Sequence, residues 1–195
     1  MTRTLAITLL AVFVGLGAAG CGNAVRTGTS TALSGFDLEV MADQMARSIM
    51  ADPDVQQAIA ERGPLKVVVL PVENRLTGEV LPQGQARAFT AQVRVLLSRS
   101  QSSAGERNFV WVNNRDTFYA LRNRELEGID PGPAPEAVSP EWALHATFRS
   151  LTDDDKRRRS AFYQAVFALT SLDNRTTLWT DVYNVKKTAV KNFLD

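Results

Sequence analysis

Apolar side chains recur every three to four residues in four stretches of the chain, a spacing that is typical of amphipathic helices. The first stretch begins at Ser34-x-x-Asp37, which has the form of a capping box. Asp52-Pro53 can cap and open the second stretch, and Gly63-Pro64 stops it. The sequence therefore predicts helices over about residues 35–50, 53–61, 83–99 and 115–127.

Two runs of strand length alternate with these helices. Residues 65–72 are almost continuously β-branched or apolar, which is typical of an interior strand that is covered on both faces. Residues 109–112 supply the next strand, after the helix at 83–99. A strand, a helix and a second strand at this spacing predict a βαβ unit, whose two strands are parallel.

The last third of the chain has the pattern of an antiparallel meander. Three runs of strand length, at 142–151, 160–172 and 177–186, are joined by short turns. The middle run carries apolar residues in both alternating phases, so we expect both faces of this sheet to be covered at least in part. Together the patterns predict an α/β fold with one domain, in which helices flank a mixed sheet of about five strands.

Composition and charge exclude several classes of function. The chain has 195 residues, and its 22 Lys and Arg nearly balance its 21 Asp and Glu. Such a neutral chain argues against nucleic acid as a partner, because binding to phosphates needs clustered positive charge. A single Cys and a single His leave little material for a Cys/His metal cluster, a disulfide framework or a Ser-His-Asp triad. We therefore expect no metal, no cofactor and no small-molecule substrate.

The candidate catalytic groups are few. His145 has no Ser or carboxylate at a spacing that implies a triad, which favours a structural or surface role. The glycines form no phosphate-binding loop of the G-x-x-x-x-G-K kind. In the turn at 153–159, three acidic residues precede a basic run without the spacing of a Ca²⁺ loop. This turn is interpreted as a solvated edge, with a binding loop for an acidic partner as the alternative, and the chain is predicted not to be an enzyme.

Two further motifs have both a functional and a structural interpretation. Asn74 and Arg75 follow the predicted buried strand, where loops often carry function, and are candidates for binding a partner. Alternatively, Asn74 only bends the chain and Arg75 pairs with a nearby carboxylate. Trp179 and Tyr183 share one face of a strand and are interpreted as core aromatics, with contact anchors as the alternative.

The N-terminus has the pattern of a secretory signal peptide. Arg3 places one positive charge before the apolar run at 5–16, and small residues follow that run. The apolar run is too short to be a comfortable membrane-spanning helix. A signal peptide is therefore predicted at residues 1–20.

The end of this segment resembles the bacterial lipobox. Ala18, Ala19 and Gly20, as residues recognised by a signal peptidase, precede Cys21, the only cysteine of the chain. The resemblance implies that the Cys21 sulfur takes a diacylglyceryl group and that the chain is cut before Cys21; several acyl chains on one residue give a stable membrane anchor. Ala18 stands where the lipobox usually has Leu. The alternative is an ordinary signal peptide followed by an accidental cysteine.

The residues after Cys21 suggest how the anchor joins the domain. Gly22 follows the cysteine in place of Asp, which by resemblance to bacterial lipoproteins favours the outer membrane and a domain facing the periplasm. Residues 22–34 are rich in Gly, Ser and Thr without an apolar period, so a flexible tether is predicted. The expected organisation is a signal peptide at 1–20, a lipid-anchored tether at 21–34 and one globular domain at 35–195.

In this order, the pieces resemble the LpoB-type outer-membrane lipoproteins that activate penicillin-binding proteins. The resemblance covers roughly residues 36–187. Its residues are Asp37-Leu38 with Met41 and Met45, the strand end Val72-Glu-Asn74-Arg75, and the closing run Leu178-Trp179-Thr-Asp181-Val-Tyr183-x-Val185-Lys186-Lys187. The chain departs from the family in its Pro-rich loop at 130–135 and Ser139-Pro140, and in its short tether.

The resemblance implies a compact α/β domain, of the kind also seen in the periplasmic parts of TolB and CsgG proteins. It implies a protein that does no chemistry and stimulates a peptidoglycan synthase, a class A penicillin-binding protein, by docking on it. The alternative is a structural or accessory component of an envelope secretion or trans-envelope assembly, as the likeness to CsgG allows. A third possibility, a hydrolase, would need a nucleophile or a pair of converging carboxylates.

Overall fold

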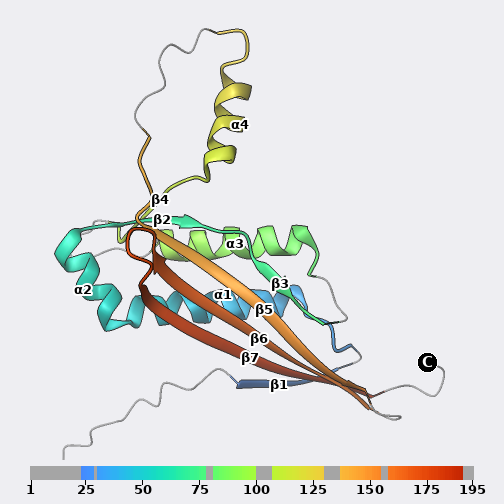
Figure 1. The fold of residues 1–195 in the computed structure, drawn as a ribbon. Helices are drawn as coiled ribbons and strands as arrows, with labels where there is room; N and C mark the ends of the chain where they lie inside the picture. Colours follow the sequence, from blue (N-terminus) through green and yellow to red (C-terminus); the bar gives the residue numbers. More distant parts are fainter. Residues whose placement is uncertain are drawn as a thin grey trace, which may run out of the picture.

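The computed structural model describes residues 23–28, 30–77, 81–99, 107–129, 137–154 and 158–190. The four helices within these residues are α1 (Gly35–Ala51), α2 (Pro53–Arg62), α3 (Gln83–Ser98) and α4 (Arg115–Glu125). Its strands are β1 (Asn23–Gly28), β2 (Leu65–Val69), β3 (Glu73–Arg75), β4 (Phe109–Trp111), β5 (Trp142–Asp154), β6 (Arg158–Ser171) and β7 (Thr177–Val190). The predicted helices and the α/β class are confirmed (Figure 1).

The strands form one mixed sheet in the order β1-β7-β6-β5-β2-β4, and β3 pairs with β5 beyond the end of β2. The predicted βαβ unit is β2-α3-β4, whose strands are parallel. The predicted meander is β5-β6-β7, which is antiparallel throughout. In the described part of the chain the sheet has seven strands where about five were predicted, because β1 and β3 carry no apolar pattern that would indicate them.

Strand β1 is where the structure differs from the expected flexible tether. Asn23–Gly28 pairs in parallel with β7, from Asn23 opposite Asn184 to Gly28 opposite Ala189. Main-chain groups alone can extend an open sheet edge, so such a strand needs no alternation of apolar and polar side chains. The globular unit therefore includes residues that the sequence assigned to the tether.

Two helix starts follow the local chemistry of the sequence. The Ser34 hydroxyl accepts a hydrogen bond from the Asp37 backbone, and the Asp37 carboxylate accepts one from the Ser34 backbone, so the capping box is present. The Asp52 carboxylate accepts hydrogen bonds from the backbones of Asp54 and Val55 at the start of α2. Gly63, at a φ of 78°, ends α2 in a conformation that favours glycine.

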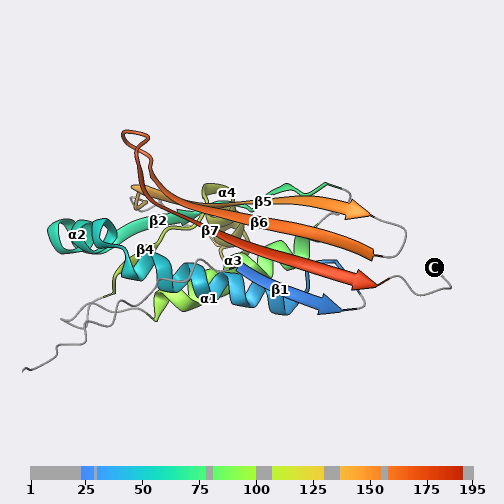
Figure 2. The ribbon, with the colours of Figure 1, turned by 90° about the horizontal axis from the view of Figure 1, so that it is seen from below.

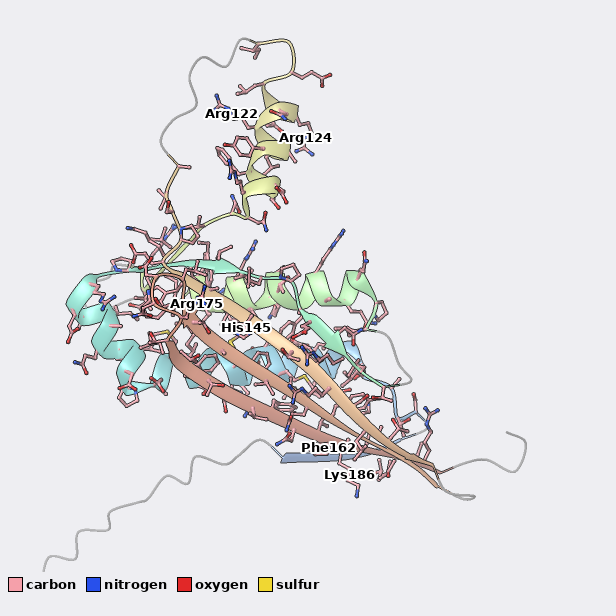
Figure 3. All side chains as sticks on the ribbon, viewed as in Figure 1. Arg122, Arg124, His145, Phe162, Arg175 and Lys186 are labelled. Carbon is pink, nitrogen blue, oxygen red and sulfur yellow. The ribbon has the colours of Figure 1, made fainter. Side chains whose placement is uncertain are left out.

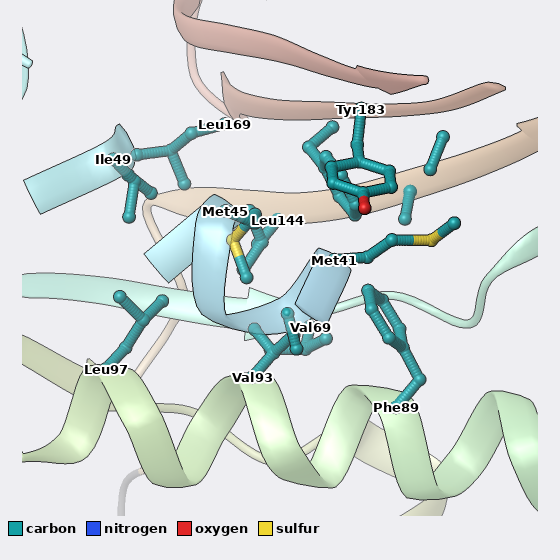
Figure 4. Packing of buried hydrophobic residues seen from close by; sticks show 14 of the residues in the cluster. Met41, Met45, Ile49, Val69, Phe89, Val93, Leu97, Leu144, Leu169 and Tyr183 are labelled. Carbon is teal, nitrogen blue, oxygen red and sulfur yellow. The ribbon is translucent and has the colours of Figure 1, made fainter. Parts of the chain in front are cut away.

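The core lies between the sheet and the pair α1 and α3, which cover the same sheet face (Figures 1 and 2). Apolar side chains of α1 fill the space between α3 and the strands, as Figure 4 shows for Met41, Met45 and Ile49. The Phe89 ring of α3 meets Phe148 of β5 edge to face, with ring centroids 5.5 Å apart. Trp179 and Tyr183 are buried in this core, so their interpretation as core aromatics is confirmed.

Within the described residues, no helix covers the opposite face of β5, β6 and β7 (Figure 2). Ala143 and Ala168 are buried on this face, so the expected cover is present only in part. The exposed apolar side chains of this face include Leu151, Phe162 and Val182. Helix α4, which could have covered this face, stands apart from the other helices and buries none of its own residues (Figure 1). Within the part of the chain that the structure describes, no helix is both long enough and apolar enough to cross a membrane.

Candidate docking surface

The open face is defined here as the uncovered side of β5, β6 and β7. Strand alternation builds it, because Leu144, Ala146 and Phe148 of β5 point to the core and the residues between them point outward. Register then sets outward side chains of neighbouring strands beside one another. The open-face residues with large or charged side chains are Arg149 and Leu151 of β5, Phe162 and Val166 of β6, and Val182 and Lys186 of β7.

One row of the open face combines apolar area with a positive charge. Phe162 lies opposite Leu151 on one side and opposite Lys186 on the other. Leu151 is 73% exposed and Phe162 is 39% exposed, so this apolar area is in contact with water. Figure 3 shows Phe162 and Lys186 together near one end of the strands.

A second row continues the surface toward the middle of the strands. Thr147, Val166 and Val182 lie side by side across β5, β6 and β7, and Val182 is 37% exposed. Arg149 lies on β5 between the two rows, and neither Arg149 nor Lys186 forms an ion pair within the described residues. The open face therefore presents an apolar strip beside two positive charges.

Arg75 lies at the margin of the open face, on β3. Arg75 is opposite Arg149 in the β3–β5 register, and its guanidinium lies 2.6 Å from the Glu73 carboxylate. Hydrogen bonds from Arg75 and then from Thr147 hold the pKa of Glu73 below its ordinary value. The Asn74 side chain accepts a hydrogen bond from the Leu76 backbone, as in an Asx turn. These contacts are the ones expected if Asn74 bends the chain and Arg75 pairs with a nearby carboxylate. A role of the two residues in partner binding stays a prediction.

His145 also lies on the outward side of β5. Its Nε2 is 3.4 Å from the Thr170 hydroxyl of β6, and the pair is partly buried. This contact supports a structural role rather than a catalytic one. Across the described ranges, no three His, Cys, Asp or Glu side chains come together in a way that could hold a metal ion.

Among the ion pairs of the described residues, the most deeply buried one is remote from the open face. Lys187 Nζ of β7 lies 2.7 Å from Asp37 Oδ2 of α1 and also donates to the Ala32 carbonyl. Burial alone would raise the pKa of Asp37, but hydrogen bonds from Lys187 and Ser34, with the charge of Lys187, hold that pKa below its ordinary value. Since Asp37 is 1% exposed, this pair belongs to the fold and offers no surface to a partner.

Several predicted site residues lie outside the described part of the chain. They are Cys21 with the lipobox residues Ala18, Ala19 and Gly20, and most side chains of the turn at 153–159. The open-face residues were not among the sequence predictions. The signal was the apolar character of both phases of β6, which indicated cover on both faces; an exposed apolar strip produces the same pattern.

Several known protein structures are similar to this chain at low sequence identity. The LpoB C-terminal domain from Escherichia coli is 14% identical, with a TM-score of 0.39 over 76% of this chain and 98% of that one. The LpoB C-terminal domain from Salmonella enterica is 13% identical, with a TM-score of 0.32 over 68% and 93%. Lipoprotein GNA1162 from Neisseria meningitidis is 16% identical, with a TM-score of 0.37 over 64% and 84%. No curated protein sequence matches the chain.

A family match covers most of the folded part of the chain. The family described as "Peptidoglycan-synthase activator LpoB" matches residues 37–185, which run from the start of α1 to the middle of β7. Proteins of this family are envelope lipoproteins. The chain therefore belongs to the LpoB family of peptidoglycan-synthase activators, which regulate an enzyme and carry out no catalysis themselves.

Proposed function

We propose that this protein activates a penicillin-binding protein of class A by docking on it through the open face. The observation that carries the proposal is that the described helices cover one side of the sheet and leave Leu151, Phe162 and Val182 exposed on the other (Figure 2). An exposed apolar strip beside charged groups is typical of a protein interface. The family match supports the activator hypothesis and gives no support to the alternative of a secretion assembly.

The chemistry of the open face describes the partner surface that would fit it. Phe162 offers an aromatic anchor, and anchors of this kind contribute most of the affinity of many interfaces. Arg149 and Lys186 have no ion-pair partners within the described residues, so a partner surface with carboxylates around an apolar centre is complementary to them. Because only two charges are involved, we expect binding to weaken modestly as salt is raised.

The lipid anchor on Cys21 is the second part of the proposal. Acylation there would hold the domain at the outer membrane on its periplasmic side, beside the cell wall that the synthase builds. The order of a small-residue segment, one cysteine and a folded domain supports this arrangement. The anchor and the docking surface can be tested separately, because Cys21 precedes the first described strand in the sequence.

A binding assay with matched substitutions tests the docking surface. We expect Phe162→Ser to weaken binding to the organism's own class A synthases by tenfold or more, since it removes a central aromatic contact of the interface. Val95→Ser is the matched control, because Val95 is 44% exposed but lies on α3, in the other layer. It should bind as the unchanged protein does.

Charge reversal provides an independent arm of the same assay. Lys186→Glu should weaken binding, and Arg47→Glu, an exposed arginine of α1, should leave binding unchanged. Each protein is first checked for an unchanged melting temperature, and stimulation of glycan polymerisation is measured beside affinity. Equal binding by Phe162→Ser, Lys186→Glu and the unchanged protein would rule out the open face as the docking site.

A further inference from the structure

A second candidate site lies at the end of the sheet where α4 is located. A cavity of about 730 Å³ opens between α4, the end of β4 and residues 137–140. Val68 and Val110 line it from the sheet, and Phe118 and Tyr119 line it from α4. Cavities of this size are typical of small-ligand sites. Val68 pairs with Ala143, which lies at the opposite end of β5 from Leu151. The cavity is therefore separate from the apolar strip of the open face.

Helix α4 contributes nothing to the core that would explain its apolar residues. None of its residues is buried, and Tyr119 remains 43% exposed. Across the cavity, Val138 is 57% exposed on the returning segment. Apolar groups gathered around a hollow and left in water indicate a surface that is covered when a ligand is bound.

The polar groups at the cavity are both donors and acceptors and are nearly neutral in sum. Asn114 uses its side-chain oxygen to cap α4, accepting from the Asp116 backbone at 2.9 Å, so its amide group can still donate. The side chains of Asn113 and Asp116 form no hydrogen bond within the described residues. The Arg115 guanidinium lies 5.8 Å from the centre of the Tyr119 ring. One cation beside one carboxylate does not form the cluster of positive charge that phosphate groups require.

We infer that this cavity binds an N-acetylated glycan strand of the peptidoglycan class. A pyranose ring has apolar C–H faces that pack against aromatic rings such as Phe118 and Tyr119, and its hydroxyl groups need donors and acceptors at the same time. The methyl of an acetamido group suits the apolar side formed by Val68 and Val110. A purely apolar ligand would leave the amides and the carboxylate unused.

This inference rests on the proposed function only for the identity of the glycan. Peptidoglycan strands are what the activated synthase makes, so a glycan site on the activator would hold the product beside the enzyme. The cavity and the open face lie at opposite ends of β5, which allows one protein to contact the synthase and the strand together. Arg115 would then pair with a carboxylate of the strand.

Titration of the purified full chain with chitohexaose, an oligomer of N-acetylglucosamine, tests the inference. Cellohexaose, which has the same backbone linkage without acetamido groups, is the matched ligand. We expect binding of chitohexaose and at least tenfold weaker binding of cellohexaose. Tyr119→Ala should weaken chitohexaose binding by roughly fivefold to tenfold, and Asn113→Ala should weaken it by roughly threefold to tenfold.

Leu121→Ala is the matched control on the same helix, because Leu121 is 42% exposed and does not line the cavity. It should bind chitohexaose as the unchanged protein does. Lack of binding at millimolar chitohexaose would overturn the inference, as would equal affinity of Tyr119→Ala and Leu121→Ala. An effect of Tyr119→Ala on synthase binding alone would also overturn it, since the cavity would then hold a protein segment.

The failure of this inference is distinguishable from failure of the proposed function. Phe162→Ser should lose synthase binding and keep chitohexaose binding, because Phe162 does not line the cavity. Tyr119→Ala should show the reverse when synthase binding is measured without glycan. Circular dichroism and melting temperature establish that each variant is folded.

Discussion

Lys187 Nζ of β7 lies 2.7 Å from Asp37 Oδ2 at the start of α1, in a region almost closed to water. The same ammonium donates to the Ala32 carbonyl, and Tyr163 of β6 donates from its hydroxyl to the Thr31 carbonyl at 2.8 Å. The ion pair therefore joins three parts of the molecule: the last strand, the first helix and the chain that leads into that helix. Because both side chains are buried, removing one partner should lower the free energy of unfolding.

We expect Lys187→Met to lower the free energy of unfolding by about 3–5 kcal/mol, because it leaves the Asp37 charge buried without its partner. The double variant Asp37→Asn with Lys187→Met should lose less, since the neutral amide leaves no buried charge and can still accept from the Ser34 backbone. Urea unfolding measures both. The neighbouring Lys186→Met should change the free energy by less than about 0.5 kcal/mol, because Lys186 is exposed. Equal losses for Lys186→Met and Lys187→Met would contradict a structural role for the pair.

The same ion pair should make the stability of the protein depend on pH in acid. The pKa of Asp37 is lower in the folded protein than its ordinary value, so the ionised form favours folding. The resulting stability is fully present above the ordinary Asp pKa of about 3.9 and is lost as the pH falls through the folded-state pKa. We therefore expect the free energy of unfolding to fall more steeply below about pH 4 in the unchanged protein than in Asp37→Asn. Parallel pH curves for the two proteins would show that Asp37 does not titrate in this way.

The Tyr163 hydroxyl should stabilise the segment that leads into α1, because it donates a hydrogen bond to the Thr31 carbonyl. Tyr163→Phe keeps the buried ring but leaves the Thr31 carbonyl without this donor, in a place where Thr31 itself is only 4% exposed. A loss of about 1–2 kcal/mol is expected in urea unfolding. Hydrogen exchange should also rise at the backbone amides of residues 31–33. An unchanged exchange rate there would mean that other contacts hold this segment.

The helices and the long strands were predictable because their patterns are local. Met41, Met45 and Ile49 repeat at helical spacing because one face of α1 is buried, and the same burial makes the periodicity visible in the sequence. The capping box at Ser34 and Asp37 is likewise a local signal. Strand β1 was not predictable, because a parallel edge strand depends on β7, more than 150 residues away.

The open face could not be predicted from the sequence for a related reason. Apolar residues in both alternating phases of β6 indicate that neither face of the strand is purely polar. They do not indicate whether another element packs on each face. The exposure of Phe162 and Val182, together with the position of α4 apart from the other helices (Figure 1), shows that no described helix covers the second face. The cavity beside α4 also needed the fold, since it brings Val68 of β2 next to Tyr119.

The anchor is tested by Cys21→Ser. Serine has no thiol to acylate, so the protein should move from the membrane fraction to the soluble periplasm or stay uncleaved, and labelling with a radioactive fatty acid should disappear. The unchanged protein, fractionated in parallel, provides the reference. Membrane fractionation and labelling that persist after the substitution would remove the lipoprotein hypothesis.

Pairing of β1 with β7 changes what the tether can do. Gly22 alone separates Cys21 from Asn23, the first residue of β1, so a paired β1 holds the domain close to an anchor on Cys21. A ten-residue Gly/Ser insert between Gly22 and Asn23 would add up to about 35 Å of reach and leave β1 paired. The same insert placed directly after Gly28 lengthens only the chain that follows β1. It adds no reach while that strand stays in the sheet.

If reach limits the activator, the insert before β1 should preserve or raise the rate of peptidoglycan synthesis in cells that carry only the altered protein. The insert after β1 should give the rate of the unchanged protein, because the paired strand still fixes the distance to the anchor. A gain from both inserts would show that β1 leaves the sheet in the working state. A loss from the insert before β1, with normal synthase binding in solution, would instead mean that the domain must sit at a fixed distance from the membrane, as in a tightly packed envelope assembly.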